Sequence, residues 1–244
     1  MILEFPRIRR NVETAYNASM EIVLLRHAEP EWVKDGVNIS NPPLTGRGHQ
    51  QAEHLASFLA AENFDEVLVS PLLRTRQTSA PILRKLSRQL VIEDWLEEIR
   101  DPIWHGTPQE KAAEAYKAQR AKDSHMRWDG LDGGEAVSDF VERIHTGCTG
   151  FLERHGVTRK DNDLPVWTME NPDQKIAFVA HGGTNSVVLC HLLGLTATPW
   201  EWERFVIGHA TVSRIQSFEL GDGHTFGLTR LSGDEHLPAT MRTV

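Results

Sequence analysis

The most constraining feature of the sequence is an apolar run that ends abruptly on two basic residues. The segment from Ile22 to Leu25 is entirely aliphatic, and Arg26 and His27 follow it directly. A short run of this kind bounded by polar residues predicts a buried parallel strand. Ligands of open α/β sheets bind beyond the carboxyl ends of the strands. Arg26 and His27 are therefore candidate site residues, although two polar residues can also end a strand without any function.

Two later strand patterns end in the same way. Residues 66–70 predict a strand that leads into a helix with Arg74 in its first turn, and Ser70 with Pro71 is the expected helix start. Residues 175–180 predict another strand, which runs directly into His181 and Gly182. Because parallel strands share one carboxyl edge, these ends are expected to converge on one site.

The remaining patterns complete an α/β fold. A further strand is expected at 89–93, Thr45 is expected to cap a helix, and a helix is expected from Ser186 to Leu193. Alternating segments at 211–218 and 225–231 predict an antiparallel hairpin at the sheet edge. The predicted fold is a three-layer α/β/α sandwich with a mostly parallel central sheet, an antiparallel edge hairpin and an inserted helical cap.

The cap is expected at about 94–173, where the alternation of strand and helix stops. Thr107 precedes a polar, alanine-rich helix to about Lys122, and Gly133-Gly134-Glu135 precedes an amphipathic helix. Residues 154–175 are polar and contain two prolines, which predicts a loop. Residues 1–19 are expected to be an N-terminal extension of a domain that covers 20–244.

The composition of the chain limits the classes of partner that it is expected to bind. The 244 residues carry a net charge of −8, which disfavours general attraction to nucleic acid or to an anionic membrane. No apolar stretch is long enough to span a bilayer, and no signal peptide is visible. Cys148 and Cys190 form neither a disulfide framework nor a metal-ligand spacing, which fits a reducing cytoplasm. The sequence specifies neither an oligomeric state nor a substrate identity.

The converging residues suit one kind of ligand. Two guanidinium groups, Arg26 and Arg74, offer paired donors that match the oxygens of a phosphate. Backbone N–H groups after His181, at the start of a helix, add to an anion site. No glycine-rich P-loop is present. The expected partner is therefore a small phosphorylated substrate.

An ordered set of short motifs resembles the histidine phosphatase, or phosphoglycerate mutase-like, superfamily. The motifs are L-R-H-A-E at 25–29, P-L-T-G-R-G-H-Q-Q-A at 43–52, S-P-L-L-R-T-R-Q-T at 70–78, L-E-E-I at 96–99, W-H-G at 104–106, G-G-E at 133–135 and A-H-G-G at 180–183. The resemblance implies that His27 is a phospho-accepting nucleophile and that Glu98 is the proton donor. It also implies that Arg26, Arg74 and His181 form the phosphate pocket, and Gly182 lies beside them.

The sequence departs from the family pattern at several positions. Ala28 stands where the family usually has Gly, Pro30 and Val33 replace polar residues, and His105 stands where a Glu is usual. The implied chemistry is a metal-independent phosphomonoester hydrolysis that needs no cofactor. A neutral imidazole attacks phosphorus, arginines stabilise the transferred group, and a carboxylic acid protonates the leaving oxygen.

Other functions stay open from the sequence alone. A phosphoglycerate mutase would use the same residues but retain the phosphoryl group. A catalytically weak phosphate-binding module is compatible with Ala28 and Pro30. The 12 histidines alone suggest a metallohydrolase, but no HExxH helix is present. His181-Gly182-Gly183 resembles an oxyanion loop, but no G-x-S-x-G elbow accompanies it. The phosphatase is favoured because acidic residues offset the basic residues of the expected cap.

Overall fold

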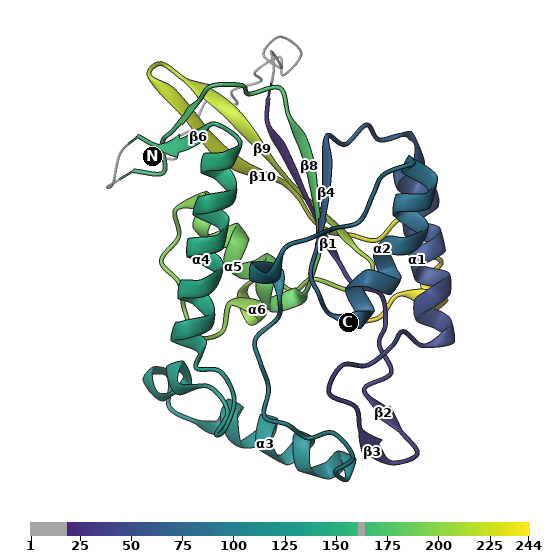
Figure 1. The fold of residues 1–244 in the computed structure, drawn as a ribbon. Coiled ribbons are helices and arrows are strands. Elements are labelled where there is room, and N and C mark those ends of the chain that lie inside the picture. The colour runs from purple at the N-terminus through teal and green to yellow at the C-terminus, as the bar shows by residue number, and fades with distance from the viewer. Residues whose placement is uncertain (1–18, 161–163) are drawn as a thin grey trace, which may run out of the picture.

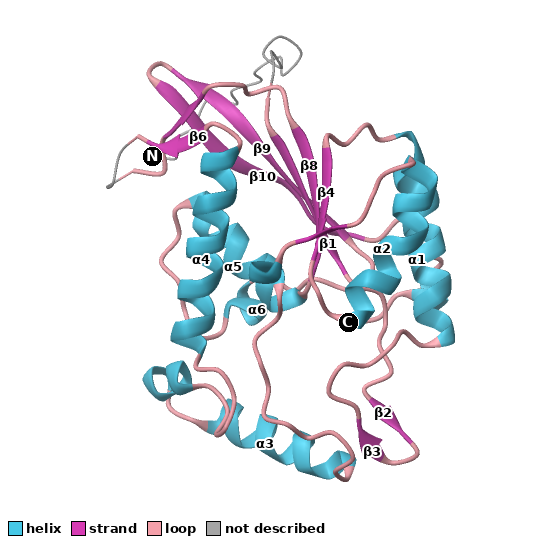
Figure 2. Ribbon diagram, in the orientation of Figure 1, coloured by secondary structure: helices cyan, strands magenta, loops and turns pink. Residues whose placement is uncertain are grey.

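A computed structural model describes residues 19–160 and 164–244 of the chain. An eight-stranded sheet crosses the molecule, with helices on both of its faces (Figures 1 and 2). The strands, in order across the sheet, are β5 (Val91–Ile92), β4 (Glu66–Val69), β8 (Lys175–Ala180), β1 (Glu21–Arg26), β9 (Val212–Leu220), β10 (Gly223–Gly233), β7 (Trp167–Met169) and β6 (Val157–Arg159).

The parallel half of the sheet consists of β5, β4, β8 and β1. The inner residues of β4, β8 and β1 are apolar because both faces of these strands are covered. In β1, Ile22 and Leu24 point into one hydrophobic cluster, while Val23 and Leu25 point into the other. All four side chains are fully buried. The apolar run seen in the sequence therefore forms a central strand.

Helices form the two outer layers. On one face, α1 and α2 pack on the cluster that contains Val23, and on the other, α4 and α5 pack on the cluster that contains Ile22 (Figure 2). The predicted three-layer sandwich with a mostly parallel sheet is confirmed. The α-helices are α1 (Gly46–Phe58), α2 (Leu73–Leu86), α3 (Gln109–Ala121), α4 (Val137–Arg154), α5 (Gly182–Leu193) and α6 (Glu201–Arg204). Short 3₁₀ turns lie at η2 (Leu59–Ala61), η3 (Asp94–Leu96), η4 (Ser124–Asp129) and η5 (Ala239–Met241).

The hairpin of β9 and β10 is antiparallel, as predicted, but it does not form the edge of the sheet. β7 pairs with β10, and β6 pairs with β7, so two short strands lie beyond it. Both strands come from residues 154–175, which the sequence predicted to be a loop. The buried indole of Trp167 packs against Phe226 of β10, which explains why this polar segment joins the sheet.

The starts of three helices can be compared with the sequence. Thr45 caps α1 by accepting the N–H of Gly48, as predicted. The prediction that Ser70 and Pro71 start α2 is wrong, because α2 begins at Leu73 and the side chain of Asn41 accepts the Leu73 N–H. The predicted start of α5 at Ser186 is also wrong, because the helix begins at Gly182, directly after His181.

The segment that lies off the sheet is narrower than the cap predicted for about 94–173. α4 belongs to a sandwich layer, and β6 and β7 belong to the sheet. What remains is the polar segment around α3 and η4, together with the hairpin of β2 (Val33–Lys34) and β3 (Val37–Asn38), beyond the carboxyl end of β1 (Figure 1). α3 begins at Gln109 rather than at Thr107 and buries no side chain, and a bridge between Val37 and Pro108 joins it to β3.

Residues 1–18 of the predicted N-terminal extension lie outside the described residues. Among the residues that are described, no helix combines the length and the apolar character needed to cross a bilayer. Cys148 on α4 and Cys190 on α5 are both buried and free.

Candidate active site

Strand register brings the predicted site residues together. Arg26 of β1 lies opposite Ala180 of β8, and Val69 of β4 lies opposite Val179. The residues that follow each strand therefore meet at one edge. The ring centroids of His27 and His181 are 5.1 Å apart. Convergence at the carboxyl ends is what a parallel sheet imposes on the residues that follow its strands.

Two buried guanidinium groups border the histidines. Arg26 donates through Nη1 to the carbonyl of Ile207, and the guanidinium of Arg74 lies 4.9 Å from the ring centroid of Trp32. The buried Nε atoms of Arg26 and Arg74 have no hydrogen-bond partner within the described chain. Burial lowers the pKa of both groups, that of Arg74 to about 10, so both stay charged at neutral pH. Two charged donor groups with unused N–H bonds suit an oxyanion.

The hydrogen bond of His27 assigns its tautomer. Nδ1 lies 2.8 Å from the backbone carbonyl of Ala28. A carbonyl can only accept, so Nδ1 carries the proton and Nε2 of the neutral ring carries the lone pair. Burial, followed by the charges of Arg74 and Arg26, holds the pKa of His27 well below its usual value. His27 is therefore a neutral imidazole with an available lone pair at neutral pH.

His181 is fixed by a residue at the end of a neighbouring strand. The hydroxyl of Ser70 and Nε2 of His181 are 2.7 Å apart, while Nδ1 of His181 is buried without a partner among the described residues. Burial is the main cause that lowers the pKa of His181, and Arg74 adds to it. Gly182 follows as the first residue of α5 and lines the cavity of the candidate site.

His209 is a site residue that the sequence did not indicate. Its ring centroid lies 5.5 Å from that of His27. Nδ1 of His209 is 2.9 Å from the hydroxyl of Thr243, and burial lowers its pKa to about 3. The position follows from β9, since the Ala210 N–H donates to the carbonyl of His27. No motif marks this pairing in the sequence.

Glu98 reaches the site from the segment after η3. Its Oε2 accepts the N–H of Gly183 at 2.9 Å, and its Oε1 accepts the N–H groups of Thr184 at 3.2 Å and Ile99 at 3.1 Å. A Cβ on Gly183 would lie 2.5 Å from Oε1, so only glycine allows this approach. The carboxylate of the neighbouring residue, Glu97, pairs instead with Arg100.

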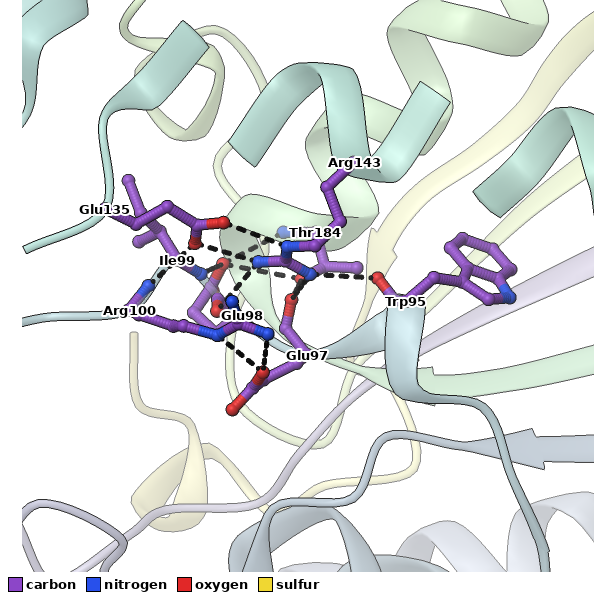
Figure 3. A network of polar contacts seen from close by, with 8 residues as sticks. All are labelled: Trp95, Glu97, Glu98, Ile99, Arg100, Glu135, Arg143 and Thr184. Carbon is purple, nitrogen blue, oxygen red and sulfur yellow. Dashed lines mark hydrogen bonds and ion pairs between the residues drawn. The ribbon is translucent and has the colours of Figure 1, made fainter. Parts of the chain in front are cut away.

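The position of Glu98 depends on a polar cluster built around Arg143 of α4 (Figure 3). The guanidinium of Arg143 forms two bonds of 2.9 Å with the Glu135 carboxylate. It also donates to the carbonyls of Trp95, Glu97 and Glu98 at 3.0–3.3 Å. One side chain therefore holds three carbonyls of the short backbone segment that carries Glu98. The sequence motif G-G-E supplies Glu135 but gives no sign of Arg143.

His27, the two arginines and Glu98 line a cavity of about 850 Å³. Its floor is formed by Arg26, His27, Arg74, Glu98 and Gly182, and its walls by the segment around α3 and by residues 202–207. Three tryptophans, Trp32, Trp104 and Trp202, also line it.

The departures from the family pattern fit the structure. Ala28 is fully buried and has no positive φ, so its Cβ causes no backbone strain. Its N–H donates to the hydroxyl of Thr78 at 2.9 Å. Pro30 pairs with Leu44 in an isolated bridge, and His105 is exposed and is not among the residues that line the cavity. None of these residues blocks the space beside His27.

Chemically, the site can hold a phosphate-sized dianion beside a neutral imidazole. Within residues 19–160 and 164–244, no group of three or more His, Cys, Asp and Glu side chains is placed to hold a metal ion. The fold and the pocket together define a class of α/β enzyme with an anion site at the carboxyl edge of its sheet.

Comparison with known proteins identifies the family. The family model of the histidine phosphatase superfamily (branch 1) matches residues 22–222, and the chain belongs to this family. Phosphoserine phosphatase 1 of Hydrogenobacter thermophilus is 30% identical over 184 residues, which cover 72% of this chain and 77% of that protein. These relatives make the chain a histidine phosphatase, which is a phosphoric monoester hydrolase.

Two more distant relatives agree with the family and the fold. A Salmonella choleraesuis protein named "Probable phosphoglycerate mutase GpmB" is 23% identical over 80% of this chain and 84% of its own length. The solved structure of a mycobacterial glucosyl-3-phosphoglycerate phosphatase superposes with a TM-score of 0.66 at 20% identity, covering 88% of this chain and 100% of that one. At this identity the structural likeness shows the fold alone.

Proposed function

We propose that the chain hydrolyses phosphomonoesters through a phosphohistidine formed on His27. In this proposal Arg26, Arg74, His181 and Gly182 hold the phosphoryl group, and Glu98 is the proton donor. The observation that carries the proposal is the hydrogen bond from Nδ1 of His27 to the Ala28 carbonyl, because it leaves the nucleophilic lone pair on Nε2 beside two charged guanidinium groups.

In the first step Nε2 of His27 forms a bond to phosphorus as the bond from phosphorus to the leaving oxygen breaks. The arginines stay protonated throughout and stabilise the equatorial oxygens of the transferred group. The leaving oxygen takes a proton from Glu98. Oε2 of Glu98 accepts a single N–H, so one of its lone pairs is free to carry that proton.

In the second step water attacks the phosphorus of the phosphohistidine. Glu98, now ionised, accepts a proton from the water, and the bond between phosphorus and Nε2 breaks. Inorganic phosphate leaves and His27 returns to its neutral form. Each step uses only groups at the floor of the cavity, so the scheme includes neither a metal nor a cofactor.

The first test examines the nucleophile. His27→Asn should lower turnover by about 10⁴-fold or more, since no other group replaces a covalent nucleophile. Rapid acid quench is too harsh for a phosphohistidine, so alkaline quench of labelled substrate should trap the label on the native chain. An unlabelled native chain, or a fully active His27→Asn variant with a native circular dichroism spectrum, would contradict the proposal.

The second test separates hydrolysis from isomerisation and from metal-dependent catalysis. A mutase must protect its phosphohistidine from water, and the similarity to a mutase-named relative makes this comparison necessary. The chain is incubated with 3-phosphoglycerate and a bisphosphoglycerate primer, and both isomerisation and phosphate release are followed. Fast isomerisation with little phosphate release would favour the mutase. Activity lost on chelation and restored by zinc or manganese would favour a metallohydrolase.

We further propose a cytoplasmic location without nucleic-acid or membrane partners. The buried free thiols of Cys148 and Cys190 support a reducing compartment, and the net charge of −8 opposes attraction to polyanions. Fractionation of the native host followed by immunoblotting tests the location.

A further inference from the structure

We propose that this site prefers phosphomonoesters with a bulky, apolar leaving group and discriminates against small esters that carry a carboxylate. The inference rests on the proposed phosphatase function and concerns the part of the cavity beyond Arg26 and Arg74. That part has to accept whatever is attached to the phosphoryl group, so its size, surface and charge describe the substrate.

The size of the cavity exceeds what a three-carbon ester needs. Its volume of about 850 Å³ lies toward the upper end of the range of about 300–1,000 Å³ found for pockets that hold drug-sized ligands. A ligand that occupies only the floor would leave the outer wall hydrated. A larger leaving group would displace that water, and binding would gain the free energy of burying the wall.

The outer wall is apolar and exposed. Ile103 is 89% exposed and Val206 is 56% exposed, and both line the cavity together with Trp32 and Tyr116, which are 43% and 39% exposed. Exposed apolar side chains gathered around a concave site mark a place where apolar ligand surface is bound. This wall is continuous with the phosphate pocket, where the arginines of the floor hold the phosphoryl group. The part of the substrate that contacts the wall is therefore the leaving group.

Two cations of the outer wall, Arg127 and Arg100, already have anionic partners. Arg127 forms two bonds with the Glu203 carboxylate, at 2.7 and 3.1 Å, and Arg100 lies 2.7 Å from that of Glu97. Arg120 is exposed, and its charge acts on Glu203 as well. A carboxylate of the leaving group that bound Arg100 or Arg127 would have to displace Glu97 or Glu203 and would be repelled by the displaced group. The charge arrangement therefore disfavours phosphoserine and phosphoglycerate.

The test is a series of n-alkyl phosphates from ethyl to hexyl, with phosphate release as the readout. Each added methylene that becomes buried should raise kcat/KM about fourfold, until the wall is covered. Propyl phosphate matches phosphoserine and 3-phosphoglycerate in chain length but lacks their carboxylate, so it should be the better substrate. A flat series, or a higher kcat/KM for phosphoserine than for propyl phosphate, would overturn the inference.

Substitutions locate the effect. Ile103→Ser and Val206→Ser should each lower kcat/KM for hexyl phosphate about fivefold and more than for ethyl phosphate, which flattens the series. Leu195→Ser is the matched control, because Leu195 is 40% exposed but does not line the cavity, and it should leave the series unchanged. Equal effects of all three substitutions would also contradict the inference.

Failure of the proposed function itself would look different. If no ester of the series releases phosphate and no label is trapped on His27, the phosphatase proposal fails, and the substrate preference fails with it. If label is trapped and phosphate is released but short anionic esters are preferred, only the substrate preference is wrong.

Discussion

At the scale of single residues, a backbone carbonyl rather than a side chain fixes the tautomer of the proposed nucleophile. The Ala28 carbonyl fixes the proton on Nδ1 of His27, whereas many catalytic histidines are oriented by a carboxylate. A carboxylate beside the ring would raise its pKa, but the charges around His27 are those of Arg26 and Arg74. The imidazole is thus kept neutral and ready to attack. The charges of the two arginines do not, however, stabilise a positive charge on the ring.

The same scale gives a prediction for Glu98. Replacing Glu98 by Gln keeps an oxygen that can accept the Gly183 N–H but removes the transferable proton. Turnover of an alkyl phosphate, whose leaving oxygen needs that proton, should fall by about 10²–10⁴-fold. Turnover of an aryl phosphate with a good leaving group should fall much less. Steady-state assays on both substrates measure the difference.

The neighbouring carboxylate provides the control for this prediction. The Glu97 carboxylate pairs with Arg100, and Glu97 contacts α5 through its backbone carbonyl, which the substitution leaves unchanged, so Glu97→Gln should affect alkyl and aryl phosphates equally. Equal losses in Glu98→Gln would mean that Glu98 only binds or positions. A dependence on the leaving group in Glu97→Gln would transfer the proton donor to the adjacent residue.

At the scale of elements, α4 controls the segment that delivers Glu98. Arg143 joins α4 to the carbonyls of Trp95, Glu97 and Glu98, and Glu135 neutralises it. Arg143→Met should lower the free energy of unfolding by about 3 kcal/mol, because it leaves the little-exposed Glu135 carboxylate without its partner. Chemical denaturation measures this loss. Because Glu98 would lose its support, the variant should also lose more activity on alkyl than on aryl phosphates.

Arg154, on the same helix, is the matched control for Arg143. It pairs with Glu93 at 2.7 Å, but its side chain is 55% exposed, and such a pair contributes about 0–1 kcal/mol. Arg154→Met should therefore change the free energy of unfolding only slightly. It should leave the preference between alkyl and aryl leaving groups unchanged. If Arg143→Met destabilises the fold but lowers both activities equally, the cluster supports the fold without positioning Glu98.

The elements also show where sequence reasoning succeeds and where it fails. β1, β4 and β8 were recognisable because strands buried on both faces must be apolar along their whole length. β6 and β7 have three residues each and partly exposed surfaces, so their sequences carry no such pattern. The start of α5 was missed because glycine disfavours helix interiors, although at Gly183 the close approach of Glu98 excludes any side chain.

At the scale of the whole molecule, the site combines residues that no local pattern links. Arg26, His27, Arg74 and His181 could be located from the sequence because each lies at the end of a strand or in the first turn of the next helix. His209 precedes β9, and its closeness to His27 depends on the antiparallel pairing of β9 with β1. Arg143 lies mid-helix, where an arginine usually faces solvent. Such residues become visible only when the sheet order and the helix orientation are known.

The whole molecule should also respond to acid through its buried histidines. Burial is the largest cause that lowers the pKa values of His27, His181 and His209, the last to about 3. In the unfolded chain these imidazoles take up protons below a pH of about 6.5, whereas in the folded chain they do not. The unfolded state therefore binds more protons as the pH falls, and stability decreases on acidification but is unaffected by these groups above that pH.

The expected slope can be stated for one residue. Each buried imidazole should lower the free energy of unfolding by up to about 1.4 kcal/mol for every pH unit below about 6.5. His209→Gln removes one titrating group, so the stability of the variant should fall less steeply with acid than that of the wild-type chain. Urea titrations at several values between pH 7.5 and 5 measure both slopes. Parallel curves would mean that His209 is protonated in the folded chain as readily as in the unfolded one, which burial and the charges of Arg26 and Arg74 should prevent.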